Sequence, residues 1–190
     1  MKKSIGAKIP IYPAPVWVIG TYDEAGNPNA MTVSWAGICC SDPPAIAISL
    51  RQSTYTYGNI LKRRAFTVNI PSEKYIKEID CLGMVSGRNV DKFALTGLTP
   101  VGSKLVDAPY IKEFPVILDC KLLNISEIGL HTQFIGQILD IMVEENCADE
   151  KGRPDLLQIK PLLMANLSYY HLGEIIGKCY TFGKDLYAPK

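Results

Sequence analysis

The sequence lacks an excess of charge of either sign, and it lacks any long apolar run. Its 190 residues include 20 basic and 19 acidic side chains, for a formal net charge of +1. No overall field therefore draws the chain toward nucleic acid or an anionic lipid surface. No run approaches the roughly 20 apolar residues of a membrane span, and the first residues hold no apolar stretch of signal-peptide length. We expect a cytoplasmic protein with no nucleic-acid partner and no membrane partner.

Cysteine motifs are missing as well. The six cysteines form no Cys-x-x-Cys pair and no Cys/His cluster at zinc-finger spacing, so the sequence indicates no metal site. Cys120 lies in the apolar run PVILDCKLL and is predicted to be a small buried side chain. Cys39 and Cys40 stand near the candidate ligand segment described below. A buried structural role is the commoner situation for cysteine, and a reactive role is the alternative.

Glycine motifs that cradle phosphates are absent too. The chain has no G-x-G-x-x-G and no G-x-x-x-x-G-K-[ST], and strands do not alternate with helices in βαβ order. These absences weigh against a Rossmann or flavodoxin-like fold. No repeat or linker divides the chain, and its 47% hydrophobic content is that of an ordinary globular protein. We expect one domain over residues 1–190 with a substantial core.

Short β-rich runs separated by Gly, Pro, Asn and Asp make up most of what is present. They predict strands over 15–22, 30–38, 45–50, 65–70, 115–128 and 131–145, the last two joined at Gly129–Leu130 as a long hairpin. Helices are predicted over 53–64, capped by Ser53 or Thr54, after the cap Ser72, and briefly over 91–95. Segment 161–180 is ambiguous. This order predicts a mainly β fold, an antiparallel β-barrel with inserted helices, which removes exposed sheet edges.

The segment 29–51, NAMTVSWAGICCSDPPAIAISLR, is the most informative for function. Polar side chains such as Asn29, Thr32 and Ser34 alternate there with small residues, and Trp35 follows. Small residues let a flat ligand approach the backbone closely, and an aromatic ligand ring needs apolar plates together with backbone donors and acceptors. The pattern is also compatible with an ordinary half-buried strand, and the residues alone leave both interpretations open.

Several short motifs share their order with a known family. N-A-M-T-V-S-W is followed by S-D-P-P-A-I-A-I-S-L-R, S-T-Y-T-Y-G-N-I, F-T-V-N-I-P, S-G-R-N-V-D-K-F and G-L-H-T-Q-F-I-G-Q-I. With these motifs the sequence resembles the flavin reductase-like FMN-binding split-barrel family, and within it the flavoredoxin branch. Each motif is weak alone, but the set spans nearly the whole chain in the right order.

The resemblance implies a six-stranded antiparallel Greek-key split barrel that forms a homodimer, with one FMN per subunit near the interface. The cofactor-binding residues it implies along the isoalloxazine are Asn29, Ala30, Met31, Thr32, Val33, Ser34 and Trp35, with Ser49 and Leu50. Those implied around the phosphate are Arg51, Ser53, Thr54, Thr56, Ser86, Gly87, Arg88 and Lys92. An FMN phosphate favours hydroxyl, amide and Arg or Lys donors, and a helix beginning near Ser53 would point its positive end at such an anion. For each basic residue alone, a solvated surface charge is the alternative.

His131 is the candidate catalytic residue, because members of the family tend to carry His there. An imidazole near the nicotinamide or the flavin edge suits proton exchange near neutral pH. A hydrogen-bonded structural histidine is the alternative. His171 has less support, and Tyr169 and Tyr170 are interpreted as packing residues that reach toward the interface.

The resemblance implies an oxidoreductase that takes electrons from NADH or NADPH through bound FMN and passes them to free flavin or to an acceptor protein. A flavoredoxin-type electron carrier without its own nicotinamide site is one alternative. A non-catalytic binding module of the same fold is another. No motif in the sequence separates the reductase from the carrier or NADH from NADPH.

Overall fold

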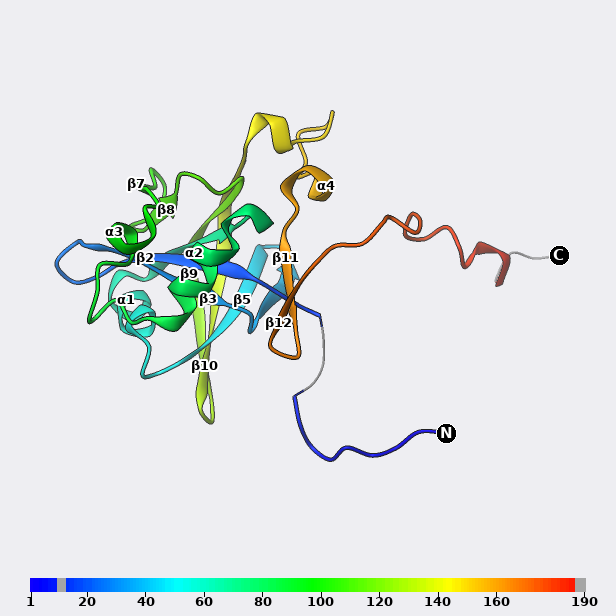
Figure 1. Ribbon diagram of the computed structural model, residues 1–190, viewed down its shortest axis with the longest axis horizontal. Coiled ribbons are helices and arrows are strands. Elements are labelled where there is room, and N and C mark those ends of the chain that lie inside the picture. The colour runs from blue at the N-terminus through cyan, green and yellow to red at the C-terminus, as the bar shows by residue number, and fades with distance from the viewer. Residues whose placement is uncertain (10–12, 187–190) are drawn as a thin grey trace.

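The computed structural model of the protein describes residues 1–9 and 13–186 (Figure 1). Its main feature is a seven-stranded antiparallel sheet in the order β3-β2-β6-β9-β10-β5-β4. The strands are β2 (Trp17–Tyr22), β3 (Pro28–Val33), β4 (Ala36–Ser41), β5 (Pro44–Arg51), β6 (Ala65–Ile70), β9 (Val116–Ile128) and β10 (His131–Val143). The long hairpin predicted around Gly129–Leu130 is confirmed as β9 and β10.

The sheet closes on itself. Strands β3 and β4 lie at opposite ends of the strand order, although only Ser34 and Trp35 separate them along the chain. The sheet must therefore curl until its two edges meet, and Ser49 N–H donates to the Trp35 carbonyl (2.8 Å) at the junction. The prediction of an antiparallel barrel is confirmed. The single strand predicted over 30–38 is wrong, because Val33 pairs with Trp17 whereas Ala36 pairs with Ile48 across the closure.

The predicted helices are present around this barrel. Helix α1 (Tyr55–Arg63) begins at the cap Thr54, whose Oγ1 accepts from Tyr57 N–H, and it ends at Arg64 in the left-handed region. A short 3-10 turn, η1 (Glu73–Tyr75), leads into α2 (Ile76–Met84), and Asp91 caps α3 (Lys92–Thr96). The remaining elements are β1 (Ala14–Pro15), β7 (Pro100–Gly102), β8 (Pro109–Ile111), η2 (Glu145–Cys147), α4 (Leu156–Ile159), β11 (Leu162–Ala165), β12 (Ser168–His171) and η3 (Lys184–Leu186). The ambiguous segment 161–180 thus contains the hairpin β11–β12.

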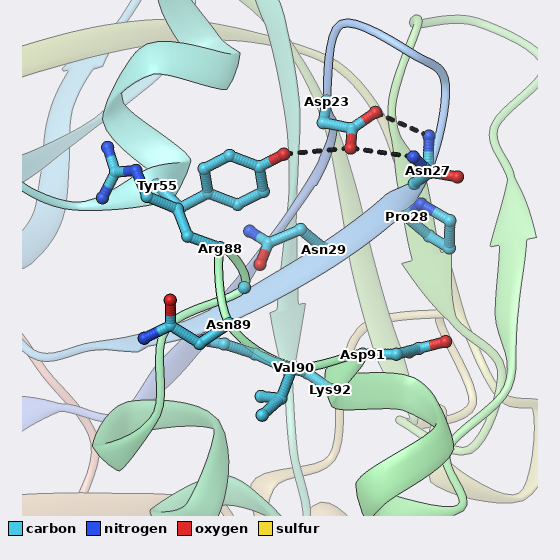
Figure 2. Close-up of a pocket in the computed structure, with 11 residues that line it drawn as sticks. Asp23, Asn27, Pro28, Asn29, Tyr55, Arg88, Asn89, Val90, Asp91 and Lys92 are labelled. Atoms are coloured by element: carbon cyan, nitrogen blue, oxygen red, sulfur yellow. Dashed lines mark hydrogen bonds between the residues drawn. The ribbon is translucent and has the colours of Figure 1, made fainter.

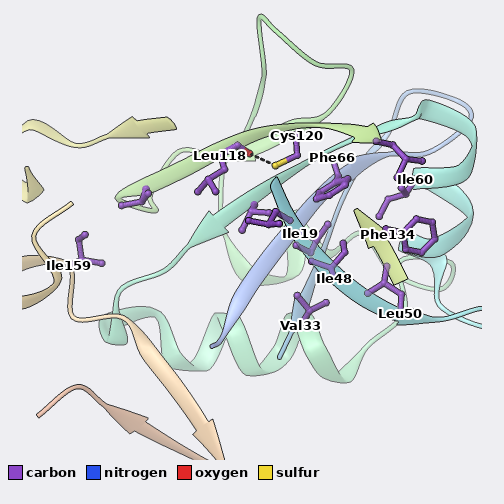
Figure 3. Packing of buried hydrophobic residues seen from close by; sticks show 14 of the residues in the cluster. Ile19, Val33, Ile48, Leu50, Ile60, Phe66, Leu118, Cys120, Phe134 and Ile159 are labelled. Atoms are coloured by element: carbon purple, nitrogen blue, oxygen red, sulfur yellow. Dashed lines mark hydrogen bonds between the residues drawn. The ribbon is translucent and has the colours of Figure 1, made fainter. Parts of the chain in front are cut away.

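Two apolar clusters fill the molecule. Phe66, Phe134 and Ile48 are fully buried inside the barrel (Figure 3), and a second cluster lies around Ile79 and Leu82 of α2. Each such side chain contributes about 1.5–3 kcal/mol by leaving water. The barrel interior is packed so closely that a Cβ at position 136, now Gly136, would lie 2.5 Å from the Phe66 ring.

The two terminal segments leave the barrel (Figure 1). Residues 1–9 are exposed, and so are nearly all described side chains over 172–186. Among them, Ile176 and Tyr180 are 93% and 96% exposed, so the C-terminal segment presents apolar surface to water. No described helix combines the length and the apolar character needed to cross a membrane.

Candidate functional site

A cleft of about 490 Å³ opens where the barrel edges meet, and we name it the main cleft. It lies between the end of β3, the ends of β5 and β10, helix α2 and the tip of the β11–β12 hairpin. Its lining consists of Met31, Thr32, Val33, Ser34, Trp35, Ser49, Leu50, Arg51, Thr54, Asp80, Gly83, Met84, His131, Leu167 and Tyr169.

A smaller hollow of about 210 Å³, the polar pocket, continues from the main cleft, and the two share Met31, Thr54, Gly83 and Met84. Its other lining residues are Ser53, Tyr55, Thr56, Val85, Ser86, Gly87 and Lys92. A third hollow of about 420 Å³, the outer pocket, is lined by residues of the turn between β2 and β3, by Tyr55 and by residues 87–92 (Figure 2). The outer pocket shares Tyr55, Gly87 and Lys92 with the polar pocket, so the two lie on opposite sides of the same residues, and we call the three neighbouring hollows together the recess.

The main cleft contains most of the residues that the resemblance assigned to a flavin ring. Met31 to Trp35, Ser49 and Leu50 all line it. Asn29 and Ala30 do not: Asn29 faces α1 and lines the outer pocket, and Ala30 is fully buried under α2. Strand geometry accounts for part of this difference, because successive side chains of β3 point to opposite faces.

Hydrogen bonds and ring contacts connect the end of β3 and the residues after it to the neighbouring elements of the main cleft. Thr32 Oγ1 donates to the Ile79 carbonyl of α2 (2.5 Å), which leaves its lone pairs as acceptors. The rings of Trp35 and His131 lie parallel, with centroids 6.1 Å apart and planes 6° apart. His131 is also opposite Arg51 in the β5–β10 register. The main cleft therefore has two parallel aromatic rings in its lining.

Free hydroxyl groups surround the recess. Among the described residues, the side chains of Ser34, Ser49 and Ser53 make no hydrogen bond, and all three line the main cleft or the polar pocket. The Ser86 hydroxyl accepts only the Arg88 backbone N–H. A recess with unengaged hydroxyls next to an arginine has the donor set that a polar, anionic ligand needs.

The residues that the resemblance assigned to a phosphate are divided among the hollows. Ser53, Thr54, Thr56, Ser86, Gly87 and Lys92 line the polar pocket, Arg51 lines the main cleft, and Arg88 lines the outer pocket. Two hydroxyls are already engaged within the protein: Thr54 Oγ1 donates to the Arg51 carbonyl (2.9 Å), and Thr56 Oγ1 accepts from Asn29 Nδ2 (3.0 Å).

Arg88 connects two loops. Its guanidinium donates to the Ser53 carbonyl (2.7 Å) and, at 3.5 Å, to the Thr54 carbonyl, and it lies 5.4 Å from the centre of the Tyr55 ring. Although Arg88 is exposed, it is not an unattached surface charge. Its bonds hold the loop 86–91 against the start of α1.

Lys92 is buried, with only 4% of its surface exposed. Its ammonium donates to the carbonyls of Ala30 in β3 (2.8 Å) and Leu82 in α2 (2.7 Å), which leaves one N–H of the three. Burial lowers the pKa of Lys92 to about 8. The alternative of a solvated surface charge is wrong for this residue, because the strand and the helix each present it with a carbonyl.

The chain is tightly packed where Asn29 of the outer pocket meets Gly87 and Tyr55, which line both the outer and the polar pocket. Asn29 Nδ2 donates to the hydroxyls of Thr21 and Thr56, while its buried Oδ1 has no partner among the described residues. A Cβ at Gly87 would lie 2.2 Å from that Oδ1 and 2.9 Å from the Tyr55 ring. Only glycine fits where the loop 86–91 crosses Asn29.

The sequence did not identify the side of the cleft formed by α2 and the β11–β12 hairpin. Asp80, Gly83 and Met84 line it from α2, and Leu167 and Tyr169 line it from the hairpin. Tyr169 Oη donates to Asp80 Oδ1 (2.8 Å). Burial, and then this hydrogen bond, raises the pKa of Tyr169 to about 12. The apolar residues at positions 79 and 82 predict which face of α2 is buried and therefore which face is free to line a cleft. No local pattern indicates that the hairpin over 162–171 contacts that free face.

The paired cysteines stand apart from the recess. Cys39 and Cys40 are exposed on the edge strand β4, so the expectation that they are buried is wrong, and neither lines the hollows described above. Partial burial raises the pKa of Cys39, which disfavours a reactive thiolate. Cys120 is fully buried, as predicted.

Comparison with known proteins gives consistent matches. The family described as flavin reductase like domain matches residues 9–173. The structure is similar to a flavoredoxin of Desulfovibrio vulgaris (Miyazaki F), with a TM-score of 0.92 and 49% identity over 97% of this chain and 100% of that one. It is also similar to a flavoredoxin from Methanosarcina acetivorans (TM-score 0.88, 30% identity, 98% of each chain). A third similar structure is an FMN-binding protein from Thermus thermophilus (TM-score 0.79, 25% identity, 94% of this chain and 97% of that one).

Proposed function

The chain belongs to the flavin reductase-like family, in its flavoredoxin branch, and we propose that it holds FMN in the main cleft and the polar pocket and passes electrons through it. Membership makes it a flavin-binding redox protein. We propose three further points: that the flavin is FMN, which residues bind it, and which molecule donates the electrons. The observation that carries it is that a cleft lined by two parallel aromatic rings adjoins a hydroxyl-lined pocket, with four lining residues in common.

The residues present fit the two halves of FMN. The main cleft offers the parallel rings of Trp35 and His131 and the acceptor oxygen of Thr32, as a planar ring with a polar edge requires. The polar pocket offers the hydroxyls of Ser53 and Ser86, to which a phosphate binds well. Thr54 caps α1 at the same place, so the positive end of the helix dipole favours an anion there.

When bound, FMN supplies an isoalloxazine that accepts and releases an electron pair. The protein binds and orients the ring and limits the access of water to it. Trp35 and His131 close one end of the main cleft, and Leu167 and Tyr169 cover it from the hairpin side. His131 is the imidazole nearest the ring site, and we assign to its side chain the exchange of a proton with solvent.

A flavin titration tests this assignment. We expect FMN to bind with quenching of its fluorescence. We expect the double variant Arg51→Ala/Arg88→Ala to weaken FMN binding: Arg51 through the loss of a charge-assisted hydrogen bond worth about 1.5–3 kcal/mol, and Arg88 because its guanidinium holds the backbone of Ser53 at the polar pocket. Riboflavin, which has no phosphate, serves as the matched control, and its affinity should be the same for the variant and the unmodified protein. Equal FMN affinities for the two proteins would contradict the phosphate site. A colourless protein that does not respond to FMN would instead favour the non-catalytic binding module.

NADH or NADPH is the proposed electron donor, and free flavin or an acceptor protein is the proposed acceptor. The likeness to flavoredoxin favours a second candidate, an electron carrier that is reduced by another protein. Anaerobic addition of NADH or NADPH to the FMN-loaded protein separates the two. Bleaching of the flavin absorption supports the reductase, whereas a flavin that only dithionite bleaches supports the carrier.

We also propose that the protein is a homodimer with the cleft near the interface. Ile38 on the edge strand β4 is 85% exposed, Trp35 before β4 is half-exposed, and the C-terminal segment carries the exposed Ile176 and Tyr180. Large apolar side chains left exposed in one chain often mark a surface that another protein covers, and a second copy of the chain is the proposed cover. Light scattering on the FMN-loaded protein should give twice the mass of the chain. A monomer that retains FMN would contradict the proposal.

A further inference from the structure

One acidic side chain reaches the main cleft. Asp80 is the sole carboxylate among the described lining residues, where the other ionisable side chains are Arg51, His131 and Tyr169. Asp80 follows Ile79, whose side chain is fully buried and whose carbonyl accepts from Thr32 Oγ1. The backbone that carries the carboxylate is therefore anchored on the floor of the cleft.

The carboxylate of Asp80 is held by a residue from a different part of the chain. Tyr169 in β12 donates its phenol hydrogen to Asp80 Oδ1 (2.8 Å), and both side chains face the cleft. Because the pKa of Tyr169 is raised to about 12, this phenol stays protonated and remains a donor at every ordinary pH. The hydrogen bond fixes the position of the carboxylate, and the phenol donor partly offsets the negative charge of the carboxylate.

A fixed negative charge in this cleft has a consequence for redox chemistry. Two-electron reduction of a flavin adds two electrons and one or two protons, so the reduced flavin is anionic whenever only one proton enters. A nearby carboxylate raises the free energy of that anion but leaves the neutral oxidised ring almost unaffected. From this geometry we propose that Asp80, positioned by Tyr169, lowers the reduction potential of the bound flavin. The inference rests on the proposed function.

The expected size of the effect is modest. Asp80 lines the cleft but is exposed, so water and salt screen its charge. We expect the carboxylate to weaken binding of reduced relative to oxidised FMN by about three- to tenfold, which for a two-electron couple corresponds to roughly 15–30 mV.

Three variants of the FMN-loaded protein test the proposal through its midpoint potential, measured by redox titration against a reference dye. Asp80→Asn removes the charge and keeps an acceptor oxygen, so the potential should rise by about 15–30 mV. Tyr169→Phe keeps the charge and removes its donor, so the potential should fall by a smaller amount. Glu78→Gln removes one negative charge from the same helix without touching the cleft, and its potential should equal that of the unmodified protein.

The opposite signs distinguish electrostatics from structure. If the Tyr169–Asp80 bond only fastens the hairpin to α2, Asp80→Asn will leave the potential unchanged or will shift it in the same direction as Tyr169→Phe, and either result overturns the proposal. Raising the salt concentration should shrink the difference between Asp80→Asn and the unmodified protein. Failure of the unmodified protein to bind FMN in a fluorescence titration overturns the proposed function together with this inference. Bound FMN with identical potentials in all variants overturns this inference alone.

Discussion

The barrel interior is stabilised by contacts between apolar side chains. The shape of the polar pocket depends instead on hydrogen bonds from side chains to backbone carbonyls. Inside the barrel, Phe66 and Phe134 pack among apolar side chains and, for Phe134, against the Tyr57 ring, with no polar group of their own to satisfy. Around the polar pocket, Lys92 and Arg88 donate to carbonyls of β3, α2 and the loop before α1. Packing therefore sets the stability of the first region, and hydrogen-bond geometry sets the shape of the second.

This difference predicts how substitutions in each region affect stability and flavin binding. Loss of volume in the barrel should reduce stability and leave the flavin site of the remaining folded protein intact. Loss of a side-chain hydrogen bond around the polar pocket should disturb the flavin site as well as stability, because these hydrogen bonds position the backbone that lines the pocket.

The largest expected effect is in the barrel. Phe66→Ala should lower the free energy of unfolding by about 3–5 kcal/mol, because it removes a fully buried ring and leaves a cavity next to Gly136. Urea denaturation measures this change, and FMN affinity per folded molecule should stay the same. The exposed Leu123→Ala is the matched control, with an expected change within about 0.5 kcal/mol. A loss of FMN affinity in Phe66→Ala would contradict the separation of the two regions.

An intermediate, pH-dependent effect is expected at Lys92. Its pKa is lowered to about 8 from an ordinary 10.5, so between these values the unfolded chain binds more protons than the folded one, and stability rises with pH. Below pH 8 both states hold the proton, and this contribution is absent. The difference in free energy of unfolding between the unmodified protein and Lys92→Met should thus grow by up to about 3 kcal/mol across this window, at about 1.4 kcal/mol per pKa unit.

Denaturant unfolding at several pH values measures the Lys92 effect. At neutral pH the Lys92→Met protein should already bind FMN more weakly, because the carbonyls of Ala30 and Leu82 lose their donor and β3 is no longer tied to α2. A difference between the two proteins that stays constant from neutral to alkaline pH would show that Lys92 does not carry the lowered pKa.

The smallest effect on stability is expected at Gly87. Gly87→Ala places a Cβ against Asn29 Oδ1 and the Tyr55 ring, which should cost about 1–3 kcal/mol and weaken FMN binding as the loop 86–91 moves outward. Gly58→Ala in α1 is the matched control: its Cβ meets nothing within 4 Å, and it should stabilise the protein by roughly 0.5–1 kcal/mol. Thermal unfolding and a flavin titration of both variants check the prediction. Unchanged FMN affinity in Gly87→Ala would mean that the loop does not shape the site.

Local signals accounted for most of the secondary structure. Thr54 and Asp91 are cap residues whose side chains accept the first helical N–H groups, and Gly129–Leu130 forms the turn of the long hairpin. The strand predicted over 30–38 failed because its break at Ser34–Trp35 has no local signature. The break is required because the chain passes there from one edge of the sheet to the other, which closes the barrel.

Local sequence was enough to predict the helix caps, the long hairpin, most residues of β5 and the loop 86–91 that line the hollows, and the family, because caps, turns, alternation and short motifs act over a few neighbours. Long-range packing was needed to place the Lys92 ammonium between two buried carbonyls, to require glycine at position 87, and to bring Asp80 and Tyr169 together across the cleft. Asp80 and Tyr169 lie 89 positions apart. Contacts over such separations are fixed by how the sheet curls and where the last hairpin docks, and no local pattern records either.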